Sequence, residues 1–163
     1  MAELDVRQRE AEAVGRRAVV GALIFDERGR LFVHRRGPDR RFLPDCWDIV
    51  GGHVEPGETL LQALARETSE ETGWTLRDAR LVHVEDWESE GPTGPDRRRE
   101  FDFIVTVDGD LSRPTLERPK QVAFRFITRG EIALLDENRR ADDGFVRRIA
   151  ELAFTERDRG SEP

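Results

Sequence analysis

The sequence predicts an α/β (α+β) fold in which helices pack on a mixed β-sheet. Two observations lead to this prediction. Several short apolar runs rich in β-branched residues end at turn-forming residues, and residues 59–72 contain neither Gly nor Pro. Such runs are typical of strands, and an uninterrupted stretch of that length is typical of a helix. With 163 residues, 37% of them hydrophobic, the chain is long enough to bury the core of one domain.

Strands are predicted where short apolar runs are bounded by turns. The first run, AVVGALIF, ends at the turn DERG, and LFVH returns from that turn. Loops are predicted for residues 36–45 and 89–97, because each contains two prolines. The predicted strands cover residues 18–25, 31–34, 47–50, part of 75–87, 101–107 and 122–127.

The central helix is predicted over residues 59–72. Thr59 is expected to cap its N-terminus, and Gly73 stands where a left-handed stop is expected. Apolar side chains recur at helical spacing along one side, at Leu60, Leu61, Leu64 and Ala65. This pattern indicates an amphipathic helix whose apolar side packs on the sheet.

The segments on either side of this region are less strongly patterned. Residues 128–131 match a capping box that opens a short helix. Asp142 or Asp143 is expected to cap a last helix that ends near Phe154. The predicted division of the chain is an N-terminal arm or peripheral helix at 1–17, one domain at 18–154 and a C-terminal tail at 155–163.

Composition and charge exclude several classes of partner. The formal net charge is −7 and no long basic run is present, so a duplex nucleic acid is not an expected partner. No run approaches the roughly 20 apolar residues that a membrane span needs. Cys46 is the only cysteine, which rules out an internal disulfide and favours a reducing, cytoplasmic location.

Three glutamates of the central helix are the first candidates for chemistry. Glu67, Glu70 and Glu71 stand at positions i, i+3 and i+4, which places their Cβ atoms about 5–6 Å apart on one helical face. Glutamate-rich helical faces are most often simply solvated. A hard divalent cation such as Mg²⁺ would, however, offset the repulsion between these carboxylates. Glu58 adds a fourth carboxylate at the helix start, and Arg66 lies one turn before Glu70.

The pattern around these glutamates resembles the signature of the Nudix family, G-x5-E-x7-R-E-U-x-E-E-x-G-U, where U is a bulky aliphatic residue. Every invariant position is matched, by Gly52, Glu58, Arg66, Glu67, Glu70, Glu71 and Gly73. Thr68 and Trp74 stand where the family usually has aliphatic residues, and both are packing positions. A looser resemblance extends over residues 18–153.

The resemblance implies an α/β/α sandwich with a mixed β-sheet, in which the signature forms a loop–helix–loop. It also implies that Glu67, Glu70 and Glu71 hold one or more Mg²⁺ ions, with Mn²⁺ as a substitute. Glu58 and a backbone carbonyl at or near Gly52 complete the implied metal-binding residues. The implied reaction is hydrolysis of a diphosphate linkage by water.

The catalytic base is the least determined of the implied roles, because family members use either a signature glutamate or one from a downstream loop. We expect Glu70 to be the base, with Glu117 of the LSRPTLERPK loop as the downstream alternative and Glu100 as the third candidate. Arg66 is expected to orient the glutamates rather than to touch the substrate.

Candidate substrate contacts lie outside the signature. Arg35, Arg36 and Arg41 are candidates for phosphate contacts, although basic residues like these more commonly provide plain surface charge. Trp87 and Phe103 are candidates to stack on a base, although aromatic residues of strands more often belong to the core. The resemblance implies a small nucleotide-like diphosphate as the partner, and elimination among the branches of the family favours a (deoxy)nucleoside triphosphate or a related nucleotide.

Two alternative functions are weighed against hydrolysis. Isopentenyl diphosphate isomerases share this fold and a similar WD..GGH lead-in. They need a catalytic cysteine well upstream of the signature, whereas Cys46 lies only six residues before Gly52. A non-catalytic nucleotide-sensing module would be expected to lack signature glutamates, and all are present here. The oligomeric state stays open, with a homodimer among the options.

Overall fold

The computed structural model describes residues 1–160, which form helices and strands around two β-sheets. The elements follow one another as α1 (Ala2–Ala13), β1 (Arg17–Ile24), β2 (Leu31–Arg36), β3 (Trp47–Asp48), β4 (Val50–His53), α2 (Leu60–Thr72), β5 (Thr75–Gly91), β6 (Gly94–Asp108), β7 (Gln121–Ile127), the 3-10 helix η1 (Arg129–Asp136) and α3 (Phe145–Arg159).

The strands are divided between two sheets. The first sheet has the order β4–β1–β6–β5, and the second has the order β3–β2–β7. β1 runs parallel to β6 and antiparallel to β4, which makes the first sheet mixed, as the sequence predicts. The single sheet of the prediction is split because β1 and β2 separate beyond one bridge, between Phe25 and Leu31.

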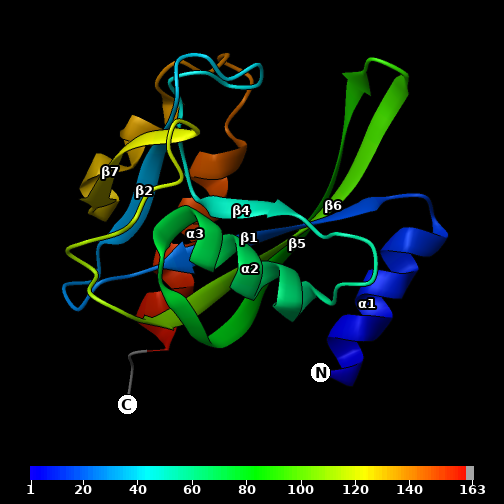
Figure 1. Ribbon diagram of the computed structural model, residues 1–163, viewed down its shortest axis with the longest axis horizontal. Coiled ribbons are helices and arrows are strands. Elements are labelled where there is room, and N and C mark those ends of the chain that lie inside the picture. The colour runs from blue at the N-terminus through cyan, green and yellow to red at the C-terminus, as the bar shows by residue number, and fades with distance from the viewer. Residues whose placement is uncertain (161–163) are drawn as a thin grey trace.

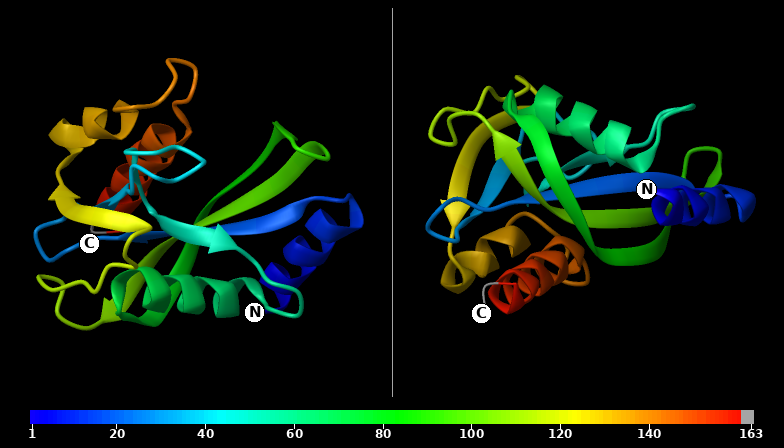
Figure 2. Two further views of the ribbon diagram at one scale, coloured as in Figure 1. Left: turned by 45° about the horizontal axis from the view of Figure 1, so that its top comes forward. Right: turned by 90° about the horizontal axis from the view of Figure 1, so that it is seen from below.

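Helices cover both faces of the first sheet, which confirms the layered arrangement implied by the resemblance. In the right-hand view of Figure 2, α2 lies on one side of the strands, and η1 and α3 lie on the other. β1 is buried on both faces, because successive side chains of a strand point in opposite directions. Val20 packs in the core beside Leu64 of α2, whereas Leu23 packs in the core beside Ile149 of α3.

The N-terminal segment forms a peripheral helix rather than a loose arm. α1 lies beside β1 and the start of α2, as Figure 1 shows. Ala11 is fully buried, and Leu4 packs against the core on the α2 side. The Gln8 Nε2 donates a hydrogen bond of 2.8 Å to the backbone oxygen of Glu58, which ties α1 to the loop before α2.

The predicted loop at residues 89–97 is wrong. β5 and β6 form one long antiparallel hairpin whose pairing continues to Gly91 and Gly94, leaving two residues for the turn. Figure 1 shows the end of this hairpin extending away from the rest of the fold. Cross-strand ion pairs, such as Arg97 with Glu88 at 3.1 Å, accompany the pairing across the predicted loop.

The C-terminal prediction is also partly wrong. Gly144 stands at the N-cap of α3, and neither predicted aspartate caps that helix. α3 continues to Arg159, so the first part of the predicted tail at 155–163 is helical. The last residues of that tail, 161–163, lie outside the described residues. Within residues 1–160, no helix combines the length and the hydrophobicity that a membrane crossing requires.

Candidate active site

The helix that carries the three glutamates is fixed at both ends by local contacts, as the sequence predicts. At its start, the Thr59 hydroxyl accepts a hydrogen bond of 3.2 Å from the backbone N–H of Gln62. The Gln62 side chain in turn accepts one of 2.9 Å from the backbone N–H of Thr59, which completes a capping box. At its end, Gly73 adopts a left-handed conformation with φ of 76°. These caps set where the glutamate face begins and ends.

The strand β4 runs beside the glutamates without a side chain in between. A Cβ atom at Gly52 would overlap the carboxylate of Glu67, so only glycine allows this close approach. The backbone of β4 therefore lies directly against the helix face. The main chain at Gly52 therefore lies next to the Glu67 carboxylate, and its part in metal binding stays a prediction.

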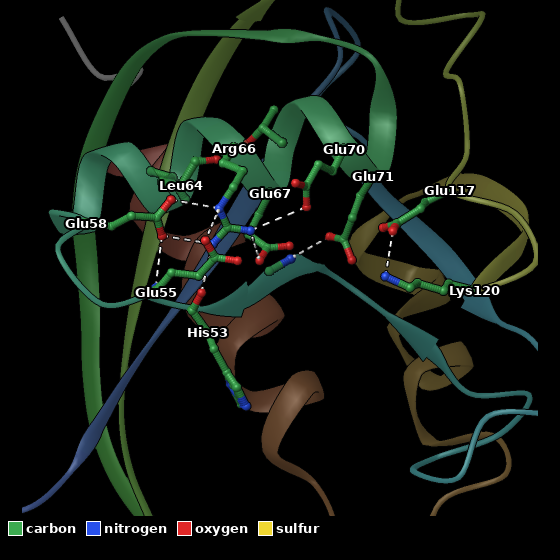
Figure 3. Close-up of polar contacts among 12 residues, drawn as sticks. His53, Glu55, Glu58, Leu64, Arg66, Glu67, Glu70, Glu71, Glu117 and Lys120 are labelled. Carbon is green, nitrogen blue, oxygen red and sulfur yellow. Dashed lines mark hydrogen bonds and ion pairs between the residues drawn. The ribbon is translucent and has the colours of Figure 1, made fainter.

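Arg66 links the carboxylates of the signature, as Figure 3 shows. Its guanidinium donates hydrogen bonds of 2.7 and 2.9 Å to the two oxygens of Glu58, and one of 2.7 Å to Glu67. A longer contact of 3.4 Å reaches Glu70, and a bond of 3.0 Å reaches the backbone oxygen of His53. The hydrogen bond from Arg66 lowers the pKa of Glu58, and the same bond raises the pKa of Arg66. Arg66 thus neutralises part of the carboxylate cluster, which fits its expected orienting role.

Glu71 is the most deeply buried of the signature glutamates, with an exposed fraction of 7%. One carboxylate oxygen accepts a hydrogen bond of 2.9 Å from the backbone N–H of Gly51, and the other accepts one of 3.1 Å from the Gln121 side chain. Burial raises the pKa of Glu71 well above its usual value. The negative charge of Glu67 adds to this rise, and the Gly51 N–H opposes it. The carboxylate is therefore held in a fixed position and is poorly solvated.

Glu67 and Glu70 differ sharply in exposure. The side chain of Glu67 is 13% exposed, whereas that of Glu70 is 49% exposed. Burial raises the pKa of Glu67, and the hydrogen bond from Arg66 opposes that rise. The helix face therefore passes from a buried carboxylate at Glu71 to an exposed one at Glu70.

The downstream loop brings Glu117 to the same site. Glu117 lies close enough to Glu67 and Glu71 for its charge to contribute to the raised pKa of both. Lys120 forms an ion pair of 2.6 Å with Glu117, and Figure 3 shows this pair next to Glu71. The loop is joined to α2 by a hydrogen bond of 2.7 Å from the Thr115 N–H to the backbone oxygen of Thr72.

The other base candidate, Glu100, does not reach the site. Its neighbours along β6, Phe101 and Phe103, are fully buried in the core that contacts α2, so Glu100 points to the opposite face of the sheet. There Glu100 accepts a hydrogen bond of 3.3 Å from the Trp87 indole N–H. Burial raises the pKa of Glu100. This placement argues against Glu100 as the base.

Trp87 and Phe103, the two aromatic residues predicted to stack on a base, are covered by other residues of the fold. Phe103 has no exposed surface on which a base could stack. Trp87 is covered on its ring by Arg98, whose guanidinium lies 4.5 Å from the ring centroid. Phe103 faces α2 but is fully buried beneath it, and Trp87 lies on the opposite face of the sheet beside Phe145 of α3.

Arg36, one of the predicted basic contacts, lies within electrostatic reach of Glu71. Burial lowers the pKa of Arg36, whereas the charges of Asp48 and Glu71 act in the opposite direction. Arg35 lies over the Trp47 ring at 6.0 Å from its centroid, and Arg41 is exposed on the following loop. The roles of Arg35, Arg36 and Arg41 as phosphate contacts stay predictions.

Gln121 and Asp48 are site neighbours that the sequence analysis did not identify. Gln121 is the first residue of β7, and Asp48 follows Trp47 in the short β3. Both are polar residues next to an apolar strand run, and this was the one signal that could have drawn attention to them. Their proximity to Glu71 depends on the second sheet, which brings segments distant in sequence beside α2.

The donor set fits a hard divalent cation. Glu58, Glu67, Glu70 and Glu71 offer carboxylate oxygens, and the main chain of β4 passes beside Glu67. Within residues 1–160, no three acidic, histidine or cysteine side chains converge closely enough to form a preformed metal centre. The Arg66 guanidinium bonds the oxygens of Glu58 and Glu67 instead. Binding of a cation thus requires the glutamate side chains to exchange part of these contacts for metal contacts.

Comparisons with known proteins agree with this arrangement. The family model described as NUDIX domain matches residues 15–149. The chain is 32% identical over 122 residues to an uncharacterized Nudix hydrolase of Listeria innocua, a match that covers 72% of this chain and 66% of that protein. It is 34% identical over 93 residues to the nucleoside triphosphatase NudI of Klebsiella pneumoniae, covering 55% of this chain and 63% of that protein. The chain therefore spans less than two thirds of either relative.

A similar fold is found among solved structures. The crystal structure of the MutT protein from Methanosarcina mazei superposes with a TM-score of 0.62 at 24% sequence identity. The match covers 90% of this chain and 96% of that one. At this identity the likeness concerns the fold alone.

Proposed function

Because the chain belongs to the NUDIX domain family, we propose that it is a Mg²⁺-dependent hydrolase that cleaves a diphosphate linkage in a small nucleotide-like substrate. The observation that carries the proposal is the cluster of signature carboxylates, linked by Arg66 and lying against the glycine backbone of β4. A (deoxy)nucleoside triphosphate or a related nucleotide is the proposed substrate. The similarity to a protein named nucleoside triphosphatase supports this choice.

Each signature residue has a proposed role. Glu67, Glu70 and Glu71 hold Mg²⁺, or Mn²⁺ as a substitute, together with the main chain near Gly52. Glu58 fixes Arg66, which in turn orients Glu67. When bound, the cation neutralises the diphosphate oxygens and lowers the pKa of a bound water. The protein contributes the fixed positions of the carboxylates and a partly desolvated wall formed by β4.

The proposed base is Glu70. Its carboxylate is half exposed, and its contact with Arg66, at 3.4 Å, is longer than the bonds of Glu58 and Glu67. Glu70 is therefore freer than its neighbours to accept a proton from the attacking water. As the proton moves to Glu70, the water oxygen bonds one phosphorus, and the bond from that phosphorus to the bridging oxygen breaks. Glu117 remains the alternative base, and its carboxylate forms an ion pair with Lys120.

Arg36 is the strongest candidate for a phosphate contact. Its guanidinium is half-buried beside the second sheet and within electrostatic reach of Glu71. An anionic substrate bridged to the glutamates by a cation would meet this positive charge at the same place. Arg35 and Arg41 are proposed as weaker contacts from the same strand and the following loop. A cytoplasmic location, without a duplex nucleic acid or a membrane as partner, is proposed with this activity.

The rival functions are less well supported. Cys46 is fully buried, and its thiol lies 3.3 Å from the backbone oxygen of Asn138. Burial raises the pKa of the Cys46 thiol, which disfavours the reactive thiolate that an isomerase cysteine would need. A nucleotide sensor would not need the complete set of glutamates. Both rivals predict that no phosphate or pyrophosphate is released from a substrate.

A substrate panel tests the proposal. The purified chain would be incubated with Mg²⁺ and nucleoside triphosphates, dinucleotides, nucleotide sugars or ADP-ribose, and products would be separated by chromatography. We expect a nucleoside monophosphate product with at least one member of the panel. We expect that product to be lost in excess EDTA. Binding of the nucleotides without release of product across the panel would favour the sensor.

A further inference from the structure

Gln121 is a buried polar residue whose side chain is only half satisfied. It is 2% exposed at the first position of β7. Its amide Nε2 donates a hydrogen bond of 3.1 Å to a carboxylate oxygen of Glu71. Its amide oxygen is buried and has no hydrogen-bond partner within residues 1–160. A buried acceptor without a partner costs stability, so packing alone does not explain an amide at this position.

The backbone of Gln121 adds a second connection to the site. Its N–H donates a hydrogen bond of 3.0 Å to the backbone oxygen of Glu117. In the pairing of β2 with β7, Gln121 stands opposite Arg36, at a register shift between Arg35 and Arg36. Gln121 thus contacts Glu71, the loop that carries Glu117 and the strand that carries Arg36.

The Gln121 amide complements the other contact to Glu71. The Gly51 N–H bonds one oxygen of that carboxylate and Gln121 bonds the other, so the carboxylate is held from two sides by two different sheets. A carboxylate fixed in this way keeps its orientation when a cation arrives, and hydrogen-bonded carboxylates are the usual form of metal-binding ones.

We propose that Gln121 is a positioning residue that orients Glu71 for binding of the divalent cation. This inference rests on the proposed function, because it assumes that Glu71 is a metal-binding residue. Gln121 does not touch the reacting atoms. Its role is to hold one oxygen of Glu71 through the amide N–H.

The test measures Mn²⁺ binding directly, by calorimetry or electron paramagnetic resonance, in wild type and in Gln121→Met. Methionine fills a similar volume without a donor or an acceptor. We expect the dissociation constant for Mn²⁺ to rise about tenfold or more, as is typical when a residue that orients a metal ligand is removed. We also expect a melting temperature near that of wild type, because removal of the unpaired amide oxygen offsets the lost hydrogen bond to Glu71. A turnover defect should shrink as Mg²⁺ is raised, with little change in substrate KM.

Two further variants complete the test. Gln121→Asn keeps the amide but shortens its reach, and it should weaken Mn²⁺ binding even if Gln121→Met fails to fold. Gln8→Met removes a different partly buried hydrogen bond, from the Gln8 side-chain amide to the backbone oxygen of Glu58. This variant should leave Mn²⁺ binding unchanged. Wild-type affinity in a folded Gln121→Met or Gln121→Asn would overturn the role of Gln121 alone. Absence of Mn²⁺ binding by the wild type would overturn the proposed function as well.

Discussion

Replacement of Arg66 by Met tests how far one guanidinium holds the carboxylate cluster together. Arg66→Met removes three short hydrogen bonds to carboxylates, two to Glu58 and one to Glu67, between side chains that are each less than one quarter exposed. It also removes a hydrogen bond of 3.0 Å to the backbone oxygen of His53. A hydrogen bond to a charged group contributes about 1.5–3 kcal/mol, and desolvation of the ions offsets part of this. The contact to Glu70 adds little, because that carboxylate is half exposed.

Counting about 1.5 kcal/mol for each of the two carboxylates, we expect Arg66→Met to lower the unfolding free energy by about 3 kcal/mol in EDTA. Mg²⁺ should restore part of that loss, because a cation that binds only the folded state stabilises it. Urea unfolding followed by circular dichroism, with and without Mg²⁺, measures both quantities. Arg77→Met is the matched control, because Arg77 pairs with Asp108 in solvent. A loss of less than about 1 kcal/mol in EDTA, the range of an ordinary surface ion pair, would show that Arg66 does not stabilise the carboxylate cluster.

Three further predictions concern the glutamates. Gly52→Ala should reduce turnover on the order of 10–100-fold, because the new Cβ displaces the Glu67 carboxylate; a variant as active as wild type would contradict the close packing. Glu70→Gln should reduce turnover by about 10²–10⁴-fold and Glu117→Gln by less than about tenfold, and the reverse order would move the base to the loop. Burial raises the pKa of Glu71 well above the value of 4.5 that it has in the unfolded chain. Between these two pKa values the folded protein binds more protons than the unfolded chain, so the free energy of unfolding falls as pH rises through this window. In EDTA, Glu71→Gln should therefore be more stable than wild type at pH 7, with the difference diminished at pH 4; equal stability at both pH values would count against the burial of a charged Glu71.

The parts of the fold that the sequence predicted are those with local signals. α2 was predicted at both ends because Thr59 and Gly73 act within one turn of the helix that they bound. The long hairpin was not predicted, because Pro92 and its neighbouring glycines indicate a loop, whereas the ladder between β5 and β6 depends on pairing across the two strands. The prolines mark only the turn and the strand end next to it.

The site shows the same division between local and long-range information. Glu67, Glu70 and Glu71 share a face by helix geometry alone, and a sequence is enough to predict that. Gln121 reaches Glu71 over fifty positions of the chain, and Glu117 reaches the site on a loop joined to α2 through Thr115. Contacts of this kind depend on how the two sheets are placed, and no local pattern in the sequence encodes them.

The most direct test of the central claim is hydrolysis of a nucleoside triphosphate in water enriched in ¹⁸O, with Mg²⁺ or with excess EDTA. We expect one ¹⁸O atom to enter one of the two phosphate-containing products with Mg²⁺. We also expect turnover to be lost in EDTA and recovered on adding Mg²⁺ or Mn²⁺. Undiminished turnover in excess EDTA, or products without ¹⁸O, would contradict metal-dependent attack of water on a diphosphate linkage.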